Sequence, residues 1–196
     1  MNKESNRLKN VKESSTLAMA ALARKYKSRG VDVISLSLGE PDFKTPQHIC
    51  DGAKEAIDSG KYFSYPPVSG YNDLKEAISL KFKNENHLNY PTQNIIVSNG
   101  VKHSITNIMF SLLNKGDEVI VFAPFWVSYA AIIKLADGLP VFIDSTIEND
   151  FKPTSEQLKD AITNKTKAII FSSPCNPTGT VFTRQDLESY KEILIN

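Results

Sequence analysis

Ala168-Ile169-Ile170-Phe171 is an apolar run, and Ser173-Pro174-Cys175-Asn176-Pro177-Thr178-Gly179 follows it after a single residue. The first stretch has the length and composition of a buried strand. In the second, each proline fixes its own φ angle and biases the residue before it toward extended backbone, so Asn176 is held in a defined geometry. A plain turn needs only Asn-Gly or Pro-Gly. Two interpretations stay open: a rigid strand-to-helix loop, or a loop that aims the Asn176 side chain at a ligand.

Apolar strands and helical patterns alternate through the rest of the second half of the chain. Strands are predicted over residues 95–98, 118–122, 140–143 and 167–172, with a helix candidate between each pair. Short, almost wholly apolar strands separated by helices indicate βαβ crossovers. We therefore predict an α/β fold with a mostly parallel sheet and helices on both faces.

Three polar clusters each follow one of these predicted strands. They are Asn99-Gly100-Val101-Lys102, Ala123-Pro124-Phe125-Trp126 and the loop that carries Asn176. Functional groups in parallel sheets gather at the carboxyl ends of the strands. The topology is thus expected to bring the three clusters to one edge.

The first half of the chain is predicted to contain helices, loops and one short strand. Helical spacing predicts a helix over residues 14–27, with Ser14 to Thr16 as cap candidates, and alternation predicts a strand over residues 31–36. Further helices are expected from Thr45-Pro46 to about residue 57 and from residue 72 or 73 to about 82, with an ordered loop over 60–70 between them. At the other end of the chain, Thr183 and Asp186 are expected to open a last helix.

Composition narrows the class of partner. Hydrophobic residues make up 41% of the chain, charged residues 23%, and the formal net charge is +1, so no basic excess points to nucleic acid or a membrane surface. The first ten residues are polar, and no apolar run approaches the roughly 20 residues of a membrane span. We expect a cytoplasmic protein. Cys50, Cys175 and the three histidines show no ligand spacing, so neither a disulfide framework nor a metal site is expected.

The polar clusters offer complementary chemistry. Gly100 and Lys102 stand where a helix begins, and the backbone N–H groups of such a turn can hold a phosphate; the alternative is an ordinary Asn-Gly turn. Trp126, the single tryptophan, could stack on a planar ring or could belong to the core. Asn176 could then bond an oxygen of that ring. Together these groups favour a planar phosphorylated cofactor over a dinucleotide, because no G-x-G-x-x-G follows any strand.

Six segments in order make the chain resemble the amino-terminal half of fold-type I, pyridoxal-phosphate-dependent class I aminotransferases, most closely the prokaryotic aspartate/prephenate subgroup. The segments are Ser37-Leu38-Gly39-Glu40-Pro41-Asp42-Phe43, residues 65–70 leading into Leu74, residues 97–102, Gly116-Asp117-Glu118-Val119, Pro124-Phe125-Trp126-Val127-Ser128-Tyr129 and residues 173–179. The resemblance implies an incomplete large domain over residues 46–196, preceded by an arm and part of the small domain over residues 1–45.

The resemblance also implies roles for individual residues toward pyridoxal 5'-phosphate. Trp126 is expected to stack on the pyridine ring and Asn176 to bond the phenolic oxygen. The backbone of Gly100 and Val101, beside Lys102, is expected to hold the phosphate. Tyr65 is expected to reach the phosphate of a neighbouring subunit, which implies a homodimer.

Substrate contacts follow from the same resemblance, which implies amino-acid and 2-oxo-acid substrates. Gly39 would offer its backbone to the α-carboxylate, next to Trp126 and Asn176. Ser14, Thr16 and Lys102 match positions around the distal carboxylate, and a cation with hydroxyls suits a dicarboxylic substrate. A plain helix cap is the alternative for Ser14 and Thr16.

Two departures and one absence qualify this resemblance. Val101 stands where the subgroup often has a second glycine, and Cys175 where another asparagine is common. Family members are about twice as long, and their other half supplies the Schiff-base lysine, for which no lysine here matches. We expect a truncated aspartate aminotransferase that is inactive in isolation. The alternatives are a glutamate/aspartate-prephenate aminotransferase, a split enzyme, or a non-catalytic remnant or binding module.

Overall fold

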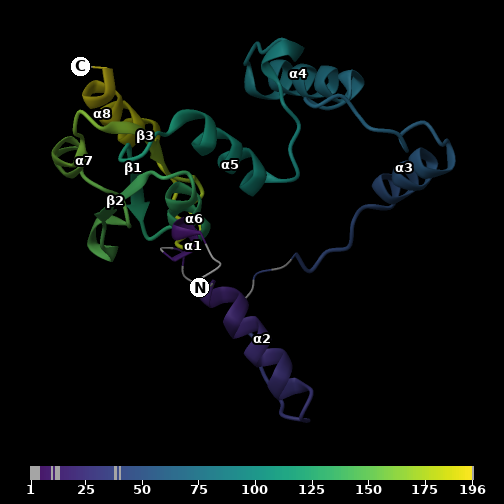
Figure 1. Ribbon diagram of the computed structural model, residues 1–196, viewed down its shortest axis with the longest axis horizontal. Coiled ribbons are helices and arrows are strands. Elements are labelled where there is room, and N and C mark those ends of the chain that lie inside the picture. Colours follow the sequence, from purple (N-terminus) through teal and green to yellow (C-terminus); the bar gives the residue numbers. More distant parts are fainter. Residues whose placement is uncertain (1–4, 10, 12–13, 38, 40, 196) are drawn as a thin grey trace. The chain divides into compact units, whose positions relative to one another are not determined.

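The computed structural model describes residues 5–9, 11, 14–37, 39 and 41–195. Within these ranges the chain forms two compact units (Figure 1). Unit 1 comprises residues 1–33 and 104–196, and unit 2 comprises residues 34–103. Helix α5 (Val101–Leu112) begins in unit 2 and continues in unit 1.

The centre of unit 1 is a parallel sheet in the order β2-β1-β3. Its strands are β1 (Glu118–Ala123), β2 (Leu139–Asp144) and β3 (Thr166–Ile170). Val121 of β1 is in register with Phe142 on one side and Ile170 on the other. Helix α6 (Ser128–Leu135) connects β1 to β2, and α7 (Ser155–Ala161), after the short η2 (Ile147–Asn149), connects β2 to β3. The predicted parallel α/β architecture is confirmed.

Strand β1 separates two hydrophobic clusters, because successive side chains of a strand point to opposite faces. Val119 and Val121 pack with residues of α5 and α6, whereas Ile120 and Phe122 pack with residues of α7 and of α8 (Arg184–Ile195). Helices therefore cover both faces of the sheet, as Figure 1 shows around the labelled strands. Val119, Ile120 and Val121 are fully buried, and burial of each such side chain contributes about 1.5–3 kcal/mol.

Two predicted strands are wrong. Residues 31–36 form no strand, and residues 95–98 follow the short η1 (Thr92–Asn94) as irregular backbone. Ile95 is buried. The Val97 N–H donates a hydrogen bond to the Ser69 carbonyl, but residues 95–98 do not form the repeated hydrogen bonds of a β-ladder. A strand requires a neighbour along its length, and an apolar pattern does not supply one. Strand β3 also ends at Ile170, two residues earlier than predicted.

Unit 2 contains the predicted helices α3 (Gln47–Asp58) and α4 (Asn72–Asn86). The predicted cap at Thr45 is wrong, because Pro46 occupies the N-cap position and provides no side-chain bond. Residues 60–70 form a loop without helix or strand, as expected. Gly70 closes it at a φ of +96°, and a Cβ atom there would lie 2.7 Å from the Val97 side chain. Only glycine fits this position without a shift of its neighbour.

The N-terminal part of unit 1 contains α1 (Asn6–Lys9) and α2 (Ser15–Lys27). Ser14 caps α2, since its Oγ accepts a hydrogen bond from the Leu17 N–H. Cys50 and Cys175 are free thiols. None of the helices in the described ranges is long and apolar enough to span a bilayer.

Candidate functional site

Trp126 lies just beyond the carboxyl end of β1. Its indole ring meets the buried Tyr129 edge to face, with 5.5 Å between ring centroids and an interplanar angle of 89°. The indole packs against the cluster formed by α5, α6 and β1 but is itself only partly buried. The Trp126 ring is therefore held by its contact with Tyr129, while part of its surface stays exposed. This placement lies between the two interpretations, a core residue and a ligand-stacking residue.

The segment that leads to Trp126 is attached to the sheet on the β2 side. The ring of Phe125 stacks on Phe142 of β2, with centroids 5.1 Å apart and planes within 4° of parallel. Ser145, directly after β2, donates a hydrogen bond to the Ala123 carbonyl. These contacts fix the backbone just before Trp126 relative to the two strands.

The loop after β3 carries Asn176 in a closed turn. The Gly179 N–H donates to the Cys175 carbonyl at 2.7 Å, and the Cys175 N–H donates to the Thr180 carbonyl at 2.8 Å. The Asn176 N–H donates to Ser172 Oγ at 3.3 Å, while the residue as a whole is exposed. The backbone around Asn176 is therefore constrained, while the residue remains accessible to solvent.

The loops after β1 and β3 meet. The Cys175 thiol donates to the Pro124 carbonyl at 3.4 Å, which joins the residue before Asn176 to the segment before Trp126. Two of the three polar clusters predicted at the sheet edge are thereby brought together in unit 1. Trp126 and Asn176 thus belong to two joined loops at this edge, and an indole face and an amide are groups whose chemistry fits a planar polar ring.

The third cluster opens α5 and belongs to unit 2. Gly100 has a φ of +79°, and no atom lies within 4 Å of where a Cβ would be. His103 Nδ1 accepts from the Asn99 N–H at 3.1 Å, and the backbone N–H of His103 donates to the Gly100 carbonyl at 3.1 Å. The Gly100 N–H donates to the Ser98 carbonyl at 2.9 Å. The turn stands at the N-terminus of α5, where the helix dipole favours an anion, so its position suits a phosphate.

The remaining predicted site residues divide between the units. Gly39 and Tyr65 are exposed residues of unit 2, and Tyr65 is fully exposed. Ser14 and Thr16 are half-buried at the start of α2 in unit 1, whereas Lys102 is exposed at the start of α5. Leu38 and Glu40, which flank Gly39 in the first matching segment, lie outside the described residues.

Sequence reasoning missed Thr180 and the group of charges near it. Lys152 Nζ lies 2.9 Å from an Asp186 carboxylate oxygen and 3.5 Å from one of Asp150. Hydrogen bonds from the Thr183 N–H and Lys152 lower the pKa of Asp186, and the bond to Asp186 raises the pKa of Lys152. The pairing of Thr183 with Asp186 was predicted as a helix opening, but no local pattern linked it to Lys152. Nowhere in the described ranges do three or more His, Cys, Asp or Glu side chains form a metal-binding group.

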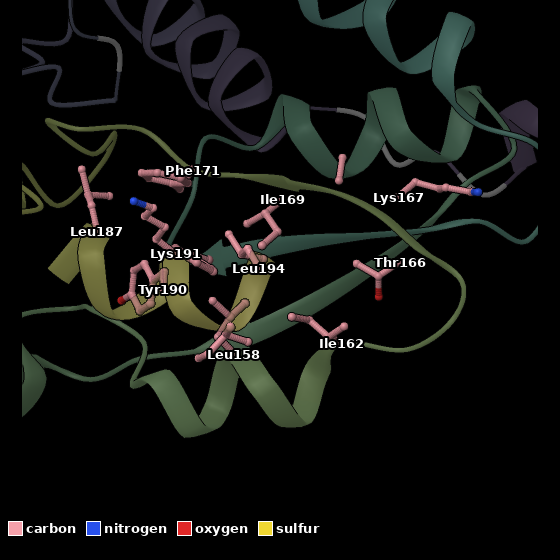
Figure 2. A pocket seen from close by; sticks show the side chains of 13 residues that line it. Leu158, Ile162, Thr166, Lys167, Ile169, Phe171, Leu187, Tyr190, Lys191 and Leu194 are labelled. Atoms are coloured by element: carbon pink, nitrogen blue, oxygen red, sulfur yellow. The ribbon is translucent and has the colours of Figure 1, made fainter. Parts of the chain in front are cut away.

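A separate apolar cavity of about 690 Å³ lies between β3, α7 and α8. Figure 2 shows Leu158, Ile169 and Leu194 facing it. Its lining includes neither Trp126 nor Asn176. This cavity offers mainly hydrocarbon surface, so it does not match the planar phosphorylated ligand suggested by the loops.

Residues 31–193 match the family model described as aminotransferase class I and II. The chain belongs to this family. It is 50% identical over 190 residues to an aspartate aminotransferase of Bacillus sp. strain YM-2. The matched region covers 97% of this chain and 48% of that protein. It is 44% identical over 192 residues to an aspartate/prephenate aminotransferase of Nitrosomonas europaea, covering 98% and 48%.

The fold agrees with this family assignment. The solved structure of Thermus thermophilus aspartate aminotransferase with maleate matches with a TM-score of 0.94 and 38% identity, covering 100% of this chain and 51% of that one. The predicted membership of the pyridoxal-phosphate-dependent transferase fold is confirmed. The chain spans about half the length of the curated relatives it matches.

Proposed function

We propose that this chain forms the cofactor-holding part of an aspartate aminotransferase. The reaction is L-aspartate + 2-oxoglutarate to oxaloacetate + L-glutamate, with pyridoxal 5'-phosphate as cofactor. The observation that carries the proposal is the bond from the Cys175 thiol to the Pro124 carbonyl, because it joins the loops of Trp126 and Asn176. The names of the relatives in Bacillus and Nitrosomonas support the same class of reaction.

Each proposed cofactor contact uses a group suited to it. The partly exposed indole of Trp126 stacks on the pyridine ring, and the Asn176 amide donates to the phenolic oxygen. The backbone at Gly100 and Val101 holds the phosphate at the N-terminus of α5, with Lys102 adding positive charge. When bound, the cofactor supplies the electron sink for the reaction. Tyr65 reaches the phosphate of a second subunit, which makes the assembly a homodimer.

The proposed substrate contacts place polar groups around a dicarboxylic acid. Gly39 binds the α-carboxylate through its backbone, beside Trp126 and Asn176. Ser14, Thr16 and Lys102 surround the distal carboxylate. The cap on α2 is compatible with this role, because the Ser14 Oγ accepts from Leu17 and its own hydrogen is still available for donation to a carboxylate.

The proposed organisation has an N-terminal arm with part of a small domain over residues 1–45 and a partial large domain over residues 46–196. The proposed location is the cytoplasm, where reduced Cys50 and Cys175 are compatible with the redox state. The partners are small-molecule amino acids and 2-oxo acids, with no role for nucleic acid.

A second candidate substrate is prephenate as the amino-group acceptor. It is favoured by the printed name of the Nitrosomonas europaea relative, aspartate/prephenate aminotransferase, at 44% identity. Rates with prephenate and with 2-oxoglutarate, measured on the same preparation, separate the two. A higher kcat/KM for prephenate would move the assignment to this second candidate.

Binding of the cofactor can be followed through Trp126, the single tryptophan of the chain. Titration with pyridoxal 5'-phosphate is expected to quench its fluorescence saturably, and Asn176→Ala to weaken the apparent Kd. Pyridoxal without the phosphate is the control ligand and should bind less tightly if the Gly100 turn holds the phosphate. No saturable quenching, or equal affinity for both ligands, would contradict the proposal.

Turnover is a separate measurement. We expect transamination only when a polypeptide that carries the Schiff-base lysine is present. Formation of oxaloacetate from aspartate by these 196 residues alone would contradict this expectation. Saturable binding without transamination in any completed preparation would favour the alternative of a non-catalytic binding module.

A further inference from the structure

Among the described residues, Thr180 is the one buried residue whose side chain is neither apolar nor aromatic, with 7% of its surface exposed. Nothing in the proposed cofactor or substrate contacts uses it. Its Oγ1 donates to the Asp150 carbonyl at 3.0 Å and accepts from the Thr178 hydroxyl at 3.0 Å. The Thr178 hydroxyl in turn accepts from the Thr180 N–H at 3.3 Å. The Thr180 side chain is therefore the link between the loop after β3 and the turn at Asp150.

The bonds of Thr180 reach both sides of Asn176. Its carbonyl accepts from the N–H of Cys175, the residue directly before Asn176, and its side chain binds Thr178, two residues after Asn176. A shift of Thr180 would therefore move the backbone on both sides of the Asn176 amide. A hydrogen bond that is lost at a buried position also leaves its partners unsatisfied.

The other end of this connection is itself held in place. Asp150 ends η2 in the left-handed region, at a φ of 53°, and its carboxylate pairs with Lys152. Lys152 also binds Asp186 in the first turn of α8. The Asp150 carbonyl, which accepts the hydrogen bond from the Thr180 hydroxyl, thus belongs to a turn that is tied to a helix, rather than to a free loop.

We propose that Thr180 is a positioning residue that holds Asn176 in the orientation needed to bond the phenolic oxygen of the cofactor. This inference rests on the proposed function for the cofactor contact. It goes beyond that function by assigning the orientation of Asn176 to a hydroxyl that touches neither cofactor nor substrate. Thr180 acts through Thr178 and Cys175, and its own anchor is the Asp150 carbonyl.

Variants can separate positioning from general stability. Thr180→Val keeps the shape and removes the hydroxyl, and Thr180→Ser keeps the hydroxyl and removes a methyl group. Ser111→Ala is the matched control, because it removes a hydroxyl-to-carbonyl bond in α5, to Asn107, outside both the loop and its anchor. Thr178→Val interrupts the same chain of bonds at a half-buried position and replaces Thr180→Val if that variant does not fold.

The first measurement needs no cofactor. Amide hydrogen exchange of Cys175 and Gly179, whose N–H groups close the loop, is compared with that of Val121 in β1. Thr180→Val is expected to accelerate exchange at both loop amides about 10-fold and to leave Val121 unchanged, while Thr180→Ser and Ser111→Ala keep the loop protected. Equal acceleration at all three amides would mean a merely structural role and would overturn the inference.

The second measurement is cofactor affinity from Trp126 fluorescence. Thr180→Val is expected to weaken the Kd about 3- to 10-fold, the range that corresponds to one net hydrogen bond. Thr180→Ser should restore it, and adding Asn176→Ala to Thr180→Val should cause little further loss. An unchanged Kd in Thr180→Val, with a weakened Kd in Asn176→Ala, would overturn the inference. If Asn176→Ala alone has no effect, the proposed cofactor contact has failed, and the exchange rates still decide whether Thr180 holds the loop.

Discussion

The thiol of Cys175 donates a hydrogen bond to the carbonyl oxygen of Pro124 over 3.4 Å. These residues are 51 positions apart in the chain, and each stands within two residues of a proposed cofactor contact. The bond therefore couples Trp126 to Asn176 through the backbone of both loops.

Removal of this bond is expected to have a small but measurable effect on the site. Cys175→Ala should weaken pyridoxal 5'-phosphate binding about 2- to 3-fold, because a thiol is a weak donor and the loop keeps its other bonds. Cys175→Ser retains a hydrogen-bond donor, so its affinity for pyridoxal 5'-phosphate should be closer to that of the original chain. Fluorescence titration of Trp126 gives both values, and tighter binding in Cys175→Ala would contradict the coupling.

Substitution of Gly70 is expected to destabilise unit 2. Gly70→Ala combines a left-handed backbone with a Cβ that would approach the Val97 side chain to 2.7 Å, so we expect a loss of about 2 kcal/mol or more in the free energy of unfolding. Urea titration of the protein measures it.

Gly52 provides the matched control for that experiment. It lies inside α3, and no atom occurs within 4 Å of its Cβ position. Gly52→Ala should therefore raise the helix propensity of α3 and stabilise the chain by about 0.5–1 kcal/mol. If Gly70→Ala and Gly52→Ala shift the urea midpoint in the same direction, the close approach of Gly70 to Val97 does not determine the effect of a Cβ on stability.

Tyr190 is expected to make stability sensitive to alkaline pH. The residue is 5% exposed, its hydroxyl donates to the Pro153 carbonyl, and burial, with the charge of Asp186, raises its pKa from 10.0 to about 12. Since the folded-state pKa lies above the unfolded one, the contribution to stability is complete below pH 10. It is lost as the pH rises from 10 through 12.

The size of this effect follows from the shift. About two pKa units correspond to about 3 kcal/mol as an upper bound, and Tyr190→Phe should lack this part of the alkaline loss. Urea unfolding of both proteins at pH 8 and pH 11 isolates the contribution, because the two proteins differ only in the Tyr190 hydroxyl. An equal decrease in the free energy of unfolding of the two proteins would show that the Tyr190 hydroxyl does not contribute to the loss of stability at alkaline pH.

The part of the fold that the sequence predicts well is the part where local pattern and tertiary environment agree. Strands β1 and β2 were predicted within one residue at each end, because each contains a run of apolar residues and β1 is buried along most of its length. Residues 31–36 and 95–98 carry strand-like patterns too, yet they lack a partner strand. The cap at Ser14 was predicted correctly because its partner, Leu17, is three residues away.

The candidate site shows the same division between local and distant information. Asn176 was found because Pro174 and Pro177 flank it within two residues in the sequence. Thr180 was missed because its role depends on the Asp150 carbonyl, 30 residues away, and on its burial. The bond of Cys175 to Pro124 likewise joins loops that only the parallel sheet brings together. Residues that carry chemistry are thus visible in the sequence, while those that hold them in place require the fold.

The position of β1 in the chain has a consequence for synthesis of the protein. β1 is the central strand, but it precedes both of its neighbours in sequence. A ribosome adds about 5–20 residues per second, so the residues between Ala123 and Ile170 take roughly 2–9 s to appear. During this interval the most apolar segment of the sheet has emerged without β3 to cover its second edge. Newly made β1 therefore keeps one hydrogen-bonding edge without its partner strand until β3 has been synthesised.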